Sequence, residues 1–151
     1  MSGSAFLPID AYKHQMDVQT RWADNDVYGH VNNVAYYSYF DTVVNTTLIE
    51  AGVLDIHDGR VIGLVVETGC RYAAPLVYPD TLSIGLGVEK LGRSSVVYRL
   101  GVTKQGETDI AAEGRFVHVY VNKETRKPVA LPEGLRGFLE GLLIDPSILT
   151  D

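Results

Sequence analysis

The sequence predicts an α+β fold in which one antiparallel β-sheet accompanies a single long helix. Two patterns lead to this prediction. Residues 33–51 carry apolar side chains at helical spacing, and from residue 81 onward apolar and polar residues alternate with the period of two that is typical of strands. The chain has 151 residues, of which 46% are hydrophobic, enough for a core of its own. We therefore expect one domain over residues 1–151, with its core at about 16–142.

Five segments are predicted to be strands. They lie near residues 16–22 and at 61–72, 81–89, 96–103 and 110–121. Turn residues separate the later segments, which indicates antiparallel neighbours. The last segment is apolar on both faces, so we expect it to occupy a central position in the sheet.

The predicted long helix at 33–51 has Asn32 as its N-cap and Gly52 as its C-terminal cap. Its second half is crowded with β-branched residues, which have low intrinsic helix propensity. Burial on several sides would have to outweigh that propensity. A short closing helix is predicted at 132–142, because Pro132 suits a first helical turn and apolar residues follow on one stripe.

Composition and charge exclude several classes of protein. Thirteen Lys and Arg against 19 Asp and Glu give a net charge of −6, so no broad positive field is available for nucleic acid or an anionic membrane. The single cysteine, Cys70, excludes an internal disulfide and favours a reducing compartment. The first residues resemble no secretion signal, and no run is long enough to cross a bilayer. We expect a cytoplasmic protein.

The segment best suited to carry a catalytic or binding site is residues 21–33, between the first strand and the long helix. It combines carboxylates, a histidine, amides and a glycine next to a helix N-terminus. Free N–H groups and the positive end of the helix dipole favour developing negative charge there. Asp26 could attack a carbonyl as a nucleophile or deprotonate a water as a general base, while amides around Asn33 polarise that carbonyl.

These residues also have structural interpretations. Asp26 could be a turn or capping residue, and His30 could be a histidine that orients the loop. Asp24, Asp26 and His30 together invite a metal interpretation, but their spacing matches no common ligand motif, so no metal is expected. His118 is expected to be a packed or surface residue.

Residues 21–36 (RWADNDVYGHVNNVAY) resemble the N-terminal motif of the 4-hydroxybenzoyl-CoA thioesterase family of hotdog-fold acyl-CoA thioesterases. Segments 71–76 (RYAAPL), 91–95 (LGRSS) and 129–132 (VALP) are similar to later motifs of that family. The resemblance implies a hotdog fold, a curled antiparallel sheet around one long central helix with a short C-terminal helix. It further implies acyl-CoA thioester hydrolysis without a metal or a bound cofactor.

The resemblance assigns roles to the residues of the motif. It implies that Asp26 is the catalytic carboxylate and that the backbone amide of Asn33 holds the thioester oxygen. Gly29 permits the turn between them. His30, Asn32 and the Asn33 side chain are expected to line or brace the pocket. Tyr36 is expected on the helix face nearby.

Other implied residues depend on assembly, because in this family two subunits form each active site. Glu67 and Thr68 are expected to approach Asp26 of a second subunit. Gly92, Arg93 and Ser94 resemble the turn that contacts the pantetheine and nucleotide of coenzyme A, where Arg93 supplies a local positive charge. A homodimer or homotetramer is therefore expected.

Acyl-CoA hydrolysis is thus the leading hypothesis for function. The main alternative is a non-catalytic acyl-CoA binding or regulatory protein that keeps the fold. A hydratase of the same fold is disfavoured, because its Asp and downstream His arrangement is not found. A purely oligomeric scaffold predicts no turnover.

Overall fold

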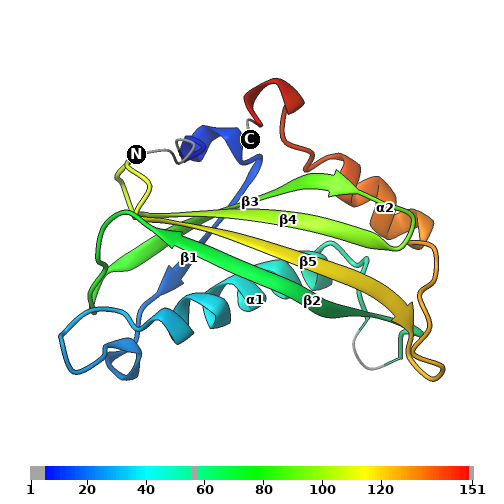
Figure 1. The fold of residues 1–151 in the computed structure, drawn as a ribbon, viewed down its shortest axis with the longest axis horizontal. Coiled ribbons are helices and arrows are strands. Elements are labelled where there is room, and N and C mark those ends of the chain that lie inside the picture. The colour runs from blue at the N-terminus through cyan, green and yellow to red at the C-terminus, as the bar shows by residue number, and fades with distance from the viewer. Residues whose placement is uncertain (1–5, 56–57, 150–151) are drawn as a thin grey trace.

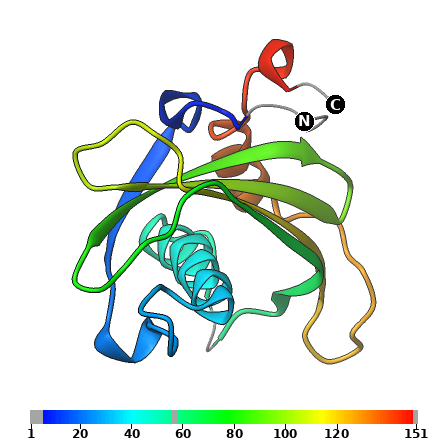
Figure 2. The same cartoon turned by 60° about the vertical axis from the view of Figure 1, so that its left-hand side comes forward.

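One antiparallel sheet of five strands forms the centre of the computed structural model, which describes residues 6–55 and 58–149 (Figure 1). The strands are β1 (His14–Gln19), β2 (Val61–Tyr72), β3 (Thr81–Leu91), β4 (Ser95–Lys104) and β5 (Ala112–Asn122). Their order across the sheet is β1-β3-β4-β5-β2, and each neighbouring pair is antiparallel. The sheet curls around α1 (Asn33–Glu50), as Figure 2 shows end-on. The predicted α+β hotdog fold is confirmed.

The four later strands match their predicted ranges with small shifts at the ends. β5 lies inside the sheet between β4 and β2, as its two apolar faces predicted. The first strand ends at Gln19 and not near Trp22, because residues 22–24 form a 3-10 helix. Both the backbone N–H and the guanidinium of Arg21 bond the Asp24 carboxylate, which turns the chain out of the sheet.

α1 crosses the concave face of the sheet and buries the side that faces it, whereas its other side remains exposed. Phe40, Val43, Val44 and Leu48 have no exposed surface. Each such side chain stabilises the fold by about 1.5–3 kcal/mol, which outweighs the few tenths of a kcal/mol that a β-branched residue costs in a helix. The expected conflict between spacing and propensity is therefore resolved by burial.

Both predicted caps of α1 are present. The Asn32 side chain accepts a hydrogen bond from the Val34 N–H at 3.0 Å. Gly52 follows the helix with a φ of +73°, a left-handed conformation that glycine adopts without strain. The closing helix, α2 (Glu133–Glu140), is shorter than predicted, and Pro132 is its N-cap and not part of its first turn. α2 packs at the end of β3.

The two terminal segments of the chain cover part of the sheet face that points away from α1 (Figure 1). The Tyr12 ring lies on the glycines of β3 and β4. A Cβ atom at Gly85 or Gly101 would come within 2.6 Å of Tyr12, and one at Gly87 within 2.7 Å of Ile144. Because only hydrogen projects from these positions, the aromatic ring can rest on the strand backbone.

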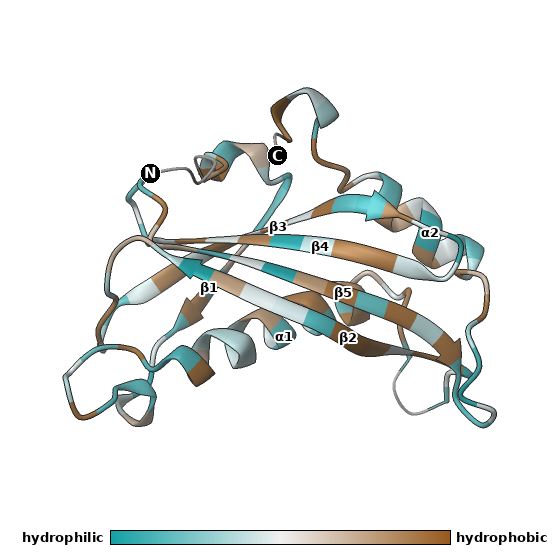
Figure 3. Ribbon diagram, viewed as in Figure 1, coloured by the Kyte–Doolittle hydropathy of each residue, from teal (hydrophilic) through white to brown (hydrophobic). Residues whose placement is uncertain are grey.

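Charged residues continue this outer face toward β2. Glu113 is buried and accepts hydrogen bonds from Arg71, Arg99 and the backbone N–H of Leu7. The N-terminal segment is thereby fixed to the sheet. Figure 3 shows hydrophobic and hydrophilic residues alternating along the strands, in agreement with one face packed on α1. Within the described residues, no helix is both long and apolar enough to span a membrane.

Candidate active site

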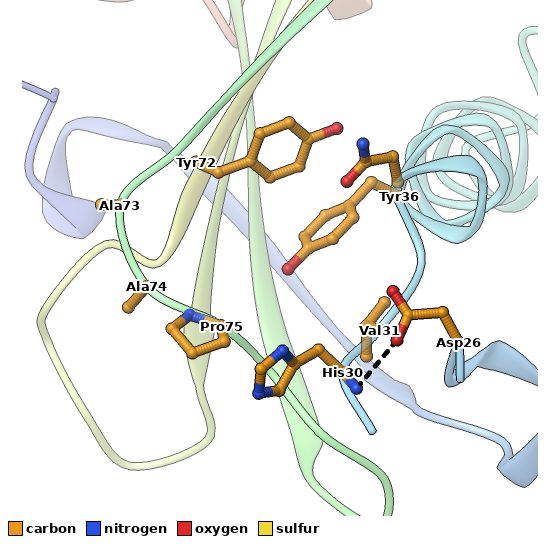
Figure 4. A pocket seen from close by; sticks show the side chains of 9 residues that line it. Asp26, His30, Val31, Tyr36, Tyr72, Ala73, Ala74 and Pro75 are labelled. Carbon is orange, nitrogen blue, oxygen red and sulfur yellow. Dashed lines mark hydrogen bonds between the residues drawn. The ribbon is translucent and has the colours of Figure 1, made fainter. Parts of the chain in front are cut away.

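A pocket of about 330 Å³ opens where the N-terminus of α1 meets the end of β2 (Figure 4). The loop before α1, the first turn of α1 and the segment after β2 supply its walls. The lining residues are Asp26, His30, Val31, Asn33, Tyr36, Tyr72, Ala73, Ala74 and Pro75. The structure therefore brings together four of the residues that the sequence singled out, at positions 26, 30, 33 and 36.

Asp26 sits in a tight turn that holds its carboxylate by backbone groups. Its Oδ1 accepts hydrogen bonds from the N–H groups of Tyr28 at 2.8 Å and His30 at 3.4 Å. Its own N–H donates to the His30 carbonyl at 2.8 Å, and the Gly29 N–H donates to the Asp26 carbonyl at 3.1 Å. Gly29 has a φ of +84°, a left-handed conformation that glycine adopts without strain.

The second carboxylate oxygen of Asp26 has no such restraint. Within residues 6–55 and 58–149, no group donates a hydrogen bond to Oδ2. The side chain thus has one oxygen fixed by the turn and one oxygen available to a ligand or a water.

Asn33 is the first residue of α1, and its backbone N–H is one of the unpaired donors of the helix N-terminus. The Asn32 cap satisfies the next N–H, that of Val34, and the Ala35 N–H bonds the Asn32 carbonyl. No described residue accepts from the Asn33 N–H. This donor and the helix dipole together favour an oxygen that becomes negatively charged.

Asp24 holds the loop before α1 in place through its hydrogen bonds. Its carboxylate is buried and accepts from the Tyr39 hydroxyl at 2.6 Å and from Arg21, while its backbone carbonyl accepts from the Asn32 N–H at 2.8 Å. Burial alone would raise the pKa of Asp24, but the hydrogen bonds from Tyr39 and Arg21 outweigh it and lower that pKa. Asp24 is therefore occupied by these partners and does not share a site with Asp26.

Two tyrosines form the inner wall of the pocket. Tyr36 is 2% exposed, and its ring meets the Tyr72 ring edge to face, with centroids 5.0 Å apart. Burial raises the pKa of Tyr36 to about 12. In Figure 4 its hydroxyl points into the space bordered by Asp26, His30 and Pro75.

Val31, Tyr72 and residues 73–75 are the lining residues that sequence reasoning did not assign to the site. The similarity of segment 71–76 to a family motif is the signal that points to Tyr72 and residues 73–75. The hydrogen bonds of Ala73 and Ala74 to the Ala111 carbonyl, at 2.8 and 3.2 Å, place this segment over the pocket.

Several predicted residues lie elsewhere within the protomer. Asn32 caps the helix and does not line the pocket. Glu67 and Thr68 lie on β2, an edge strand, where the Glu67 carboxylate pairs with Arg115 at 3.1 Å. Their expected approach to a second subunit involves a chain that the structure does not contain.

The turn of Gly92, Arg93 and Ser94 lies at the opposite end of the molecule from the pocket. β3 leads from the pocket end to this turn and spans about 35 Å. The carbonyl of Gly92 accepts from Arg136 of α2, and Arg93 is exposed. Within one protomer the structure therefore does not bring this turn to Asp26.

Comparisons with known proteins identify the family of the chain. Residues 20–139 match the family model described as the thioesterase-like superfamily. The chain is 26% identical over 130 residues to the long-chain acyl-CoA thioesterase FadM of Escherichia coli, covering 85% of this chain and 98% of FadM.

Two solved structures from Pseudomonas aeruginosa are also similar. The PA5185 protein is 50% identical with a TM-score of 0.89, over 91% of this chain and 96% of that one. The PA2801 protein is 26% identical with a TM-score of 0.78, over 84% and 98%. The protein belongs to the thioesterase-like superfamily of hotdog proteins.

Proposed function

We propose that the protein hydrolyses acyl-CoA thioesters to a free acid and coenzyme A. One observation carries this proposal: the free Oδ2 of Asp26 and the unpaired N–H of Asn33 belong to residues that line one pocket, at the N-terminus of α1. An acceptor that activates an attacking group and a donor that receives negative charge are the two parts that acyl transfer requires. The similarity to FadM, named as a long-chain acyl-CoA thioesterase, supports this substrate class.

The chemistry follows from these two groups. The thioester carbonyl oxygen accepts a hydrogen bond from the Asn33 N–H, which makes the carbonyl carbon more electrophilic. Asp26 removes a proton from water as the water oxygen forms a bond to that carbon, and negative charge moves onto the carbonyl oxygen. When the carbonyl re-forms, the C–S bond breaks, and the departing thiolate takes up the proton held by Asp26, which restores the carboxylate.

Asp26 can also act as the nucleophile. Its carboxylate then adds to the carbonyl carbon and expels the thiolate, and water hydrolyses the resulting mixed anhydride. A single turnover in ¹⁸O-labelled water tests the nucleophilic route, because label in the Asp26 carboxylate identifies the anhydride. Direct water attack leaves Asp26 unlabelled, whereas hydrolysis of the anhydride at its aspartyl carbon transfers the label into the Asp26 carboxylate.

A second copy of the chain is part of the proposal. β2 is an edge strand with one row of unpaired backbone groups, and Val65 and Val66 on it are 44% and 60% exposed. Antiparallel pairing of two β2 strands would form a homodimer. The start of one β2 would then lie beside the end of the other, on the side of the pocket, and the turn at 92–94 of the second copy would approach the pocket from the same end.

Thiol release from short, medium, long and aromatic acyl-CoA esters tests the proposed activity. Hydrolysis of at least one ester by the wild-type protein is the expected result, and the best ester identifies the acyl class. Binding of acyl-CoA without turnover would favour the alternative of a non-catalytic acyl-CoA binding protein. Absence of both binding and turnover would contradict the proposal.

A further inference from the structure

Tyr36 differs from the other deeply buried tyrosines in what its hydroxyl contacts. Tyr39 donates to Asp24 at 2.6 Å, and Tyr98 and Tyr120 share a hydrogen bond of 2.8 Å. The Tyr12 hydroxyl has no partner among the described residues and is sealed from solvent. The Tyr36 hydroxyl also has no partner among them, but it opens into the pocket. A hydroxyl kept unpaired in this way is available to a ligand.

The helix geometry determines where this hydroxyl points. Side chains in a helix tilt toward its N-terminus, so a tyrosine one turn into α1 extends back over the first turn. Tyr36 lies three residues after Asn33, and Figure 4 shows its oxygen inside the pocket, directed toward His30 and Pro75. Ring contacts fix the orientation, with centroids at 5.0 Å to Tyr72 and 6.1 Å to Tyr39.

The chemistry of the pocket determines what the hydroxyl does. Burial raises the pKa of Tyr36 to about 12, so the group keeps its proton at neutral pH and serves as a donor. Asp26 already supplies the acceptor that an attacking water needs. The oxygen that lacks a second donor is the thioester carbonyl oxygen, which is expected beside the Asn33 N–H at the positive end of α1.

We propose that the Tyr36 hydroxyl donates a second hydrogen bond to the thioester carbonyl oxygen, next to the bond from the Asn33 N–H. This inference rests on the proposed thioesterase function. As the attacking group adds, negative charge grows on the oxygen and the hydrogen bond from Tyr36 strengthens, with no transfer of its proton. Tyr36 is then a catalytic residue that lowers the barrier more than it tightens substrate binding.

The substitution Tyr36→Phe tests this role, because it removes one oxygen and leaves the ring contacts in place. Loss of one oxyanion donor reduces kcat on the order of 100-fold. We expect such a fall with KM changed less than about twofold. Tyr37→Phe is the matched control, since the same change on the next residue affects a side chain outside the pocket lining, and it should leave kcat unchanged.

Two unreactive analogues separate a contact to the carbonyl from a general structural effect. One is a CoA ketone in which CH₂ replaces sulfur and the carbonyl remains. The other is an alkyl-CoA thioether that lacks the carbonyl. Tyr36→Phe should weaken binding of the ketone several-fold and leave binding of the thioether unchanged.

The outcomes are distinguishable. Wild-type kcat in Tyr36→Phe, or equal weakening of both analogues together with a lower Tm, would overturn the role of Tyr36. A wild-type protein that hydrolyses no ester would overturn the proposed function instead. The comparison of the two analogues would still decide whether Tyr36 contacts a carbonyl oxygen.

Discussion

Asp24 and Asp26 are two residues apart, yet the structure gives them separate tasks. The carboxylate of Asp24 is buried among donors and holds the loop, whereas Asp26 presents one oxygen to the pocket. Sequence alone places both carboxylates in one segment. The difference depends on Tyr39, which lies two turns into α1 and reaches Asp24 only when the helix packs against the loop.

Tyr39→Phe should therefore loosen the loop without touching the substrate. Removal of one hydrogen bond to a buried carboxylate is expected to destabilise the fold by about 1.5–3 kcal/mol, visible in urea unfolding. We expect kcat to fall with this loss, because Asp26 is held by the same loop. Tyr28→Phe, at an exposed position, is the control. Unchanged stability in Tyr39→Phe would contradict the bracing role of Asp24.

His118 gives a second prediction at the residue scale, and it concerns pH. The side chain is 3% exposed, its ring packs 4.9 Å from that of Tyr98, and its Nε2 has no hydrogen-bond partner among the described residues. Burial lowers its pKa from 6.5 to about 4, while Asp41 opposes this effect. Between these values the unfolded chain binds a proton that the folded chain does not.

Stability should therefore fall as the pH drops below 6.5, by up to about 3 kcal/mol at pH 4 from this group alone. In His118→Phe this part of the pH dependence should disappear, as measured by urea unfolding at a series of pH values. His30→Gln, at an exposed histidine, should keep it. Identical pH dependence in the wild type and His118→Phe would show that His118 titrates normally.

At the scale of elements, the helix and the later strands follow from local patterns. The range of α1 was predictable because its caps, Asn32 and Gly52, lie in sequence beside the apolar spacing. Only part of the pocket lining could be predicted from the sequence. Residues 26–36 were identifiable as a compact motif, whereas Tyr72 reaches Tyr36 through the register of β2 on β5, which pairs it with Ala112. Such long-range register is not encoded in any short segment.

The contact of the N-terminal segment with the sheet supplies a prediction at the same scale. Gly101→Ala would place a Cβ 2.6 Å from the Tyr12 ring, so it should destabilise the fold by about 1–3 kcal/mol. In a Tyr12→Ala background the same change should be neutral or slightly stabilising. A double-mutant cycle by urea unfolding measures this coupling. Additive effects would mean that Tyr12 does not rest on β4.

For the whole molecule, the two faces and the edges of the sheet have different occupants. α1 covers one face, and the terminal segments with Tyr12 and Ile144 cover part of the other. β2 remains as a long edge with exposed valines. These observations make β2 the surface best suited to a second copy of the chain.

Val66→Lys should weaken the proposed dimer, because it places a charge on the apolar edge. Light scattering coupled to gel filtration should show a dimer or larger assembly for the wild type and a shift toward monomer for the variant. Ile49→Lys, at a similarly exposed position on α1, should behave as the wild type. A monomeric wild-type protein would refute the proposed assembly.

The kcat/KM of Asp26→Asn tests the central claim most directly. This substitution keeps a side-chain oxygen for the Tyr28 and His30 N–H groups and removes the carboxylate charge. Glu140→Gln, an equivalent change at an exposed residue of α2, is the control. With the best acyl-CoA ester, we expect the kcat/KM of Asp26→Asn to fall on the order of 100-fold or more, while the control retains wild-type kcat/KM. Wild-type kcat/KM in a folded Asp26→Asn protein would contradict the claim that Asp26 drives thioester hydrolysis.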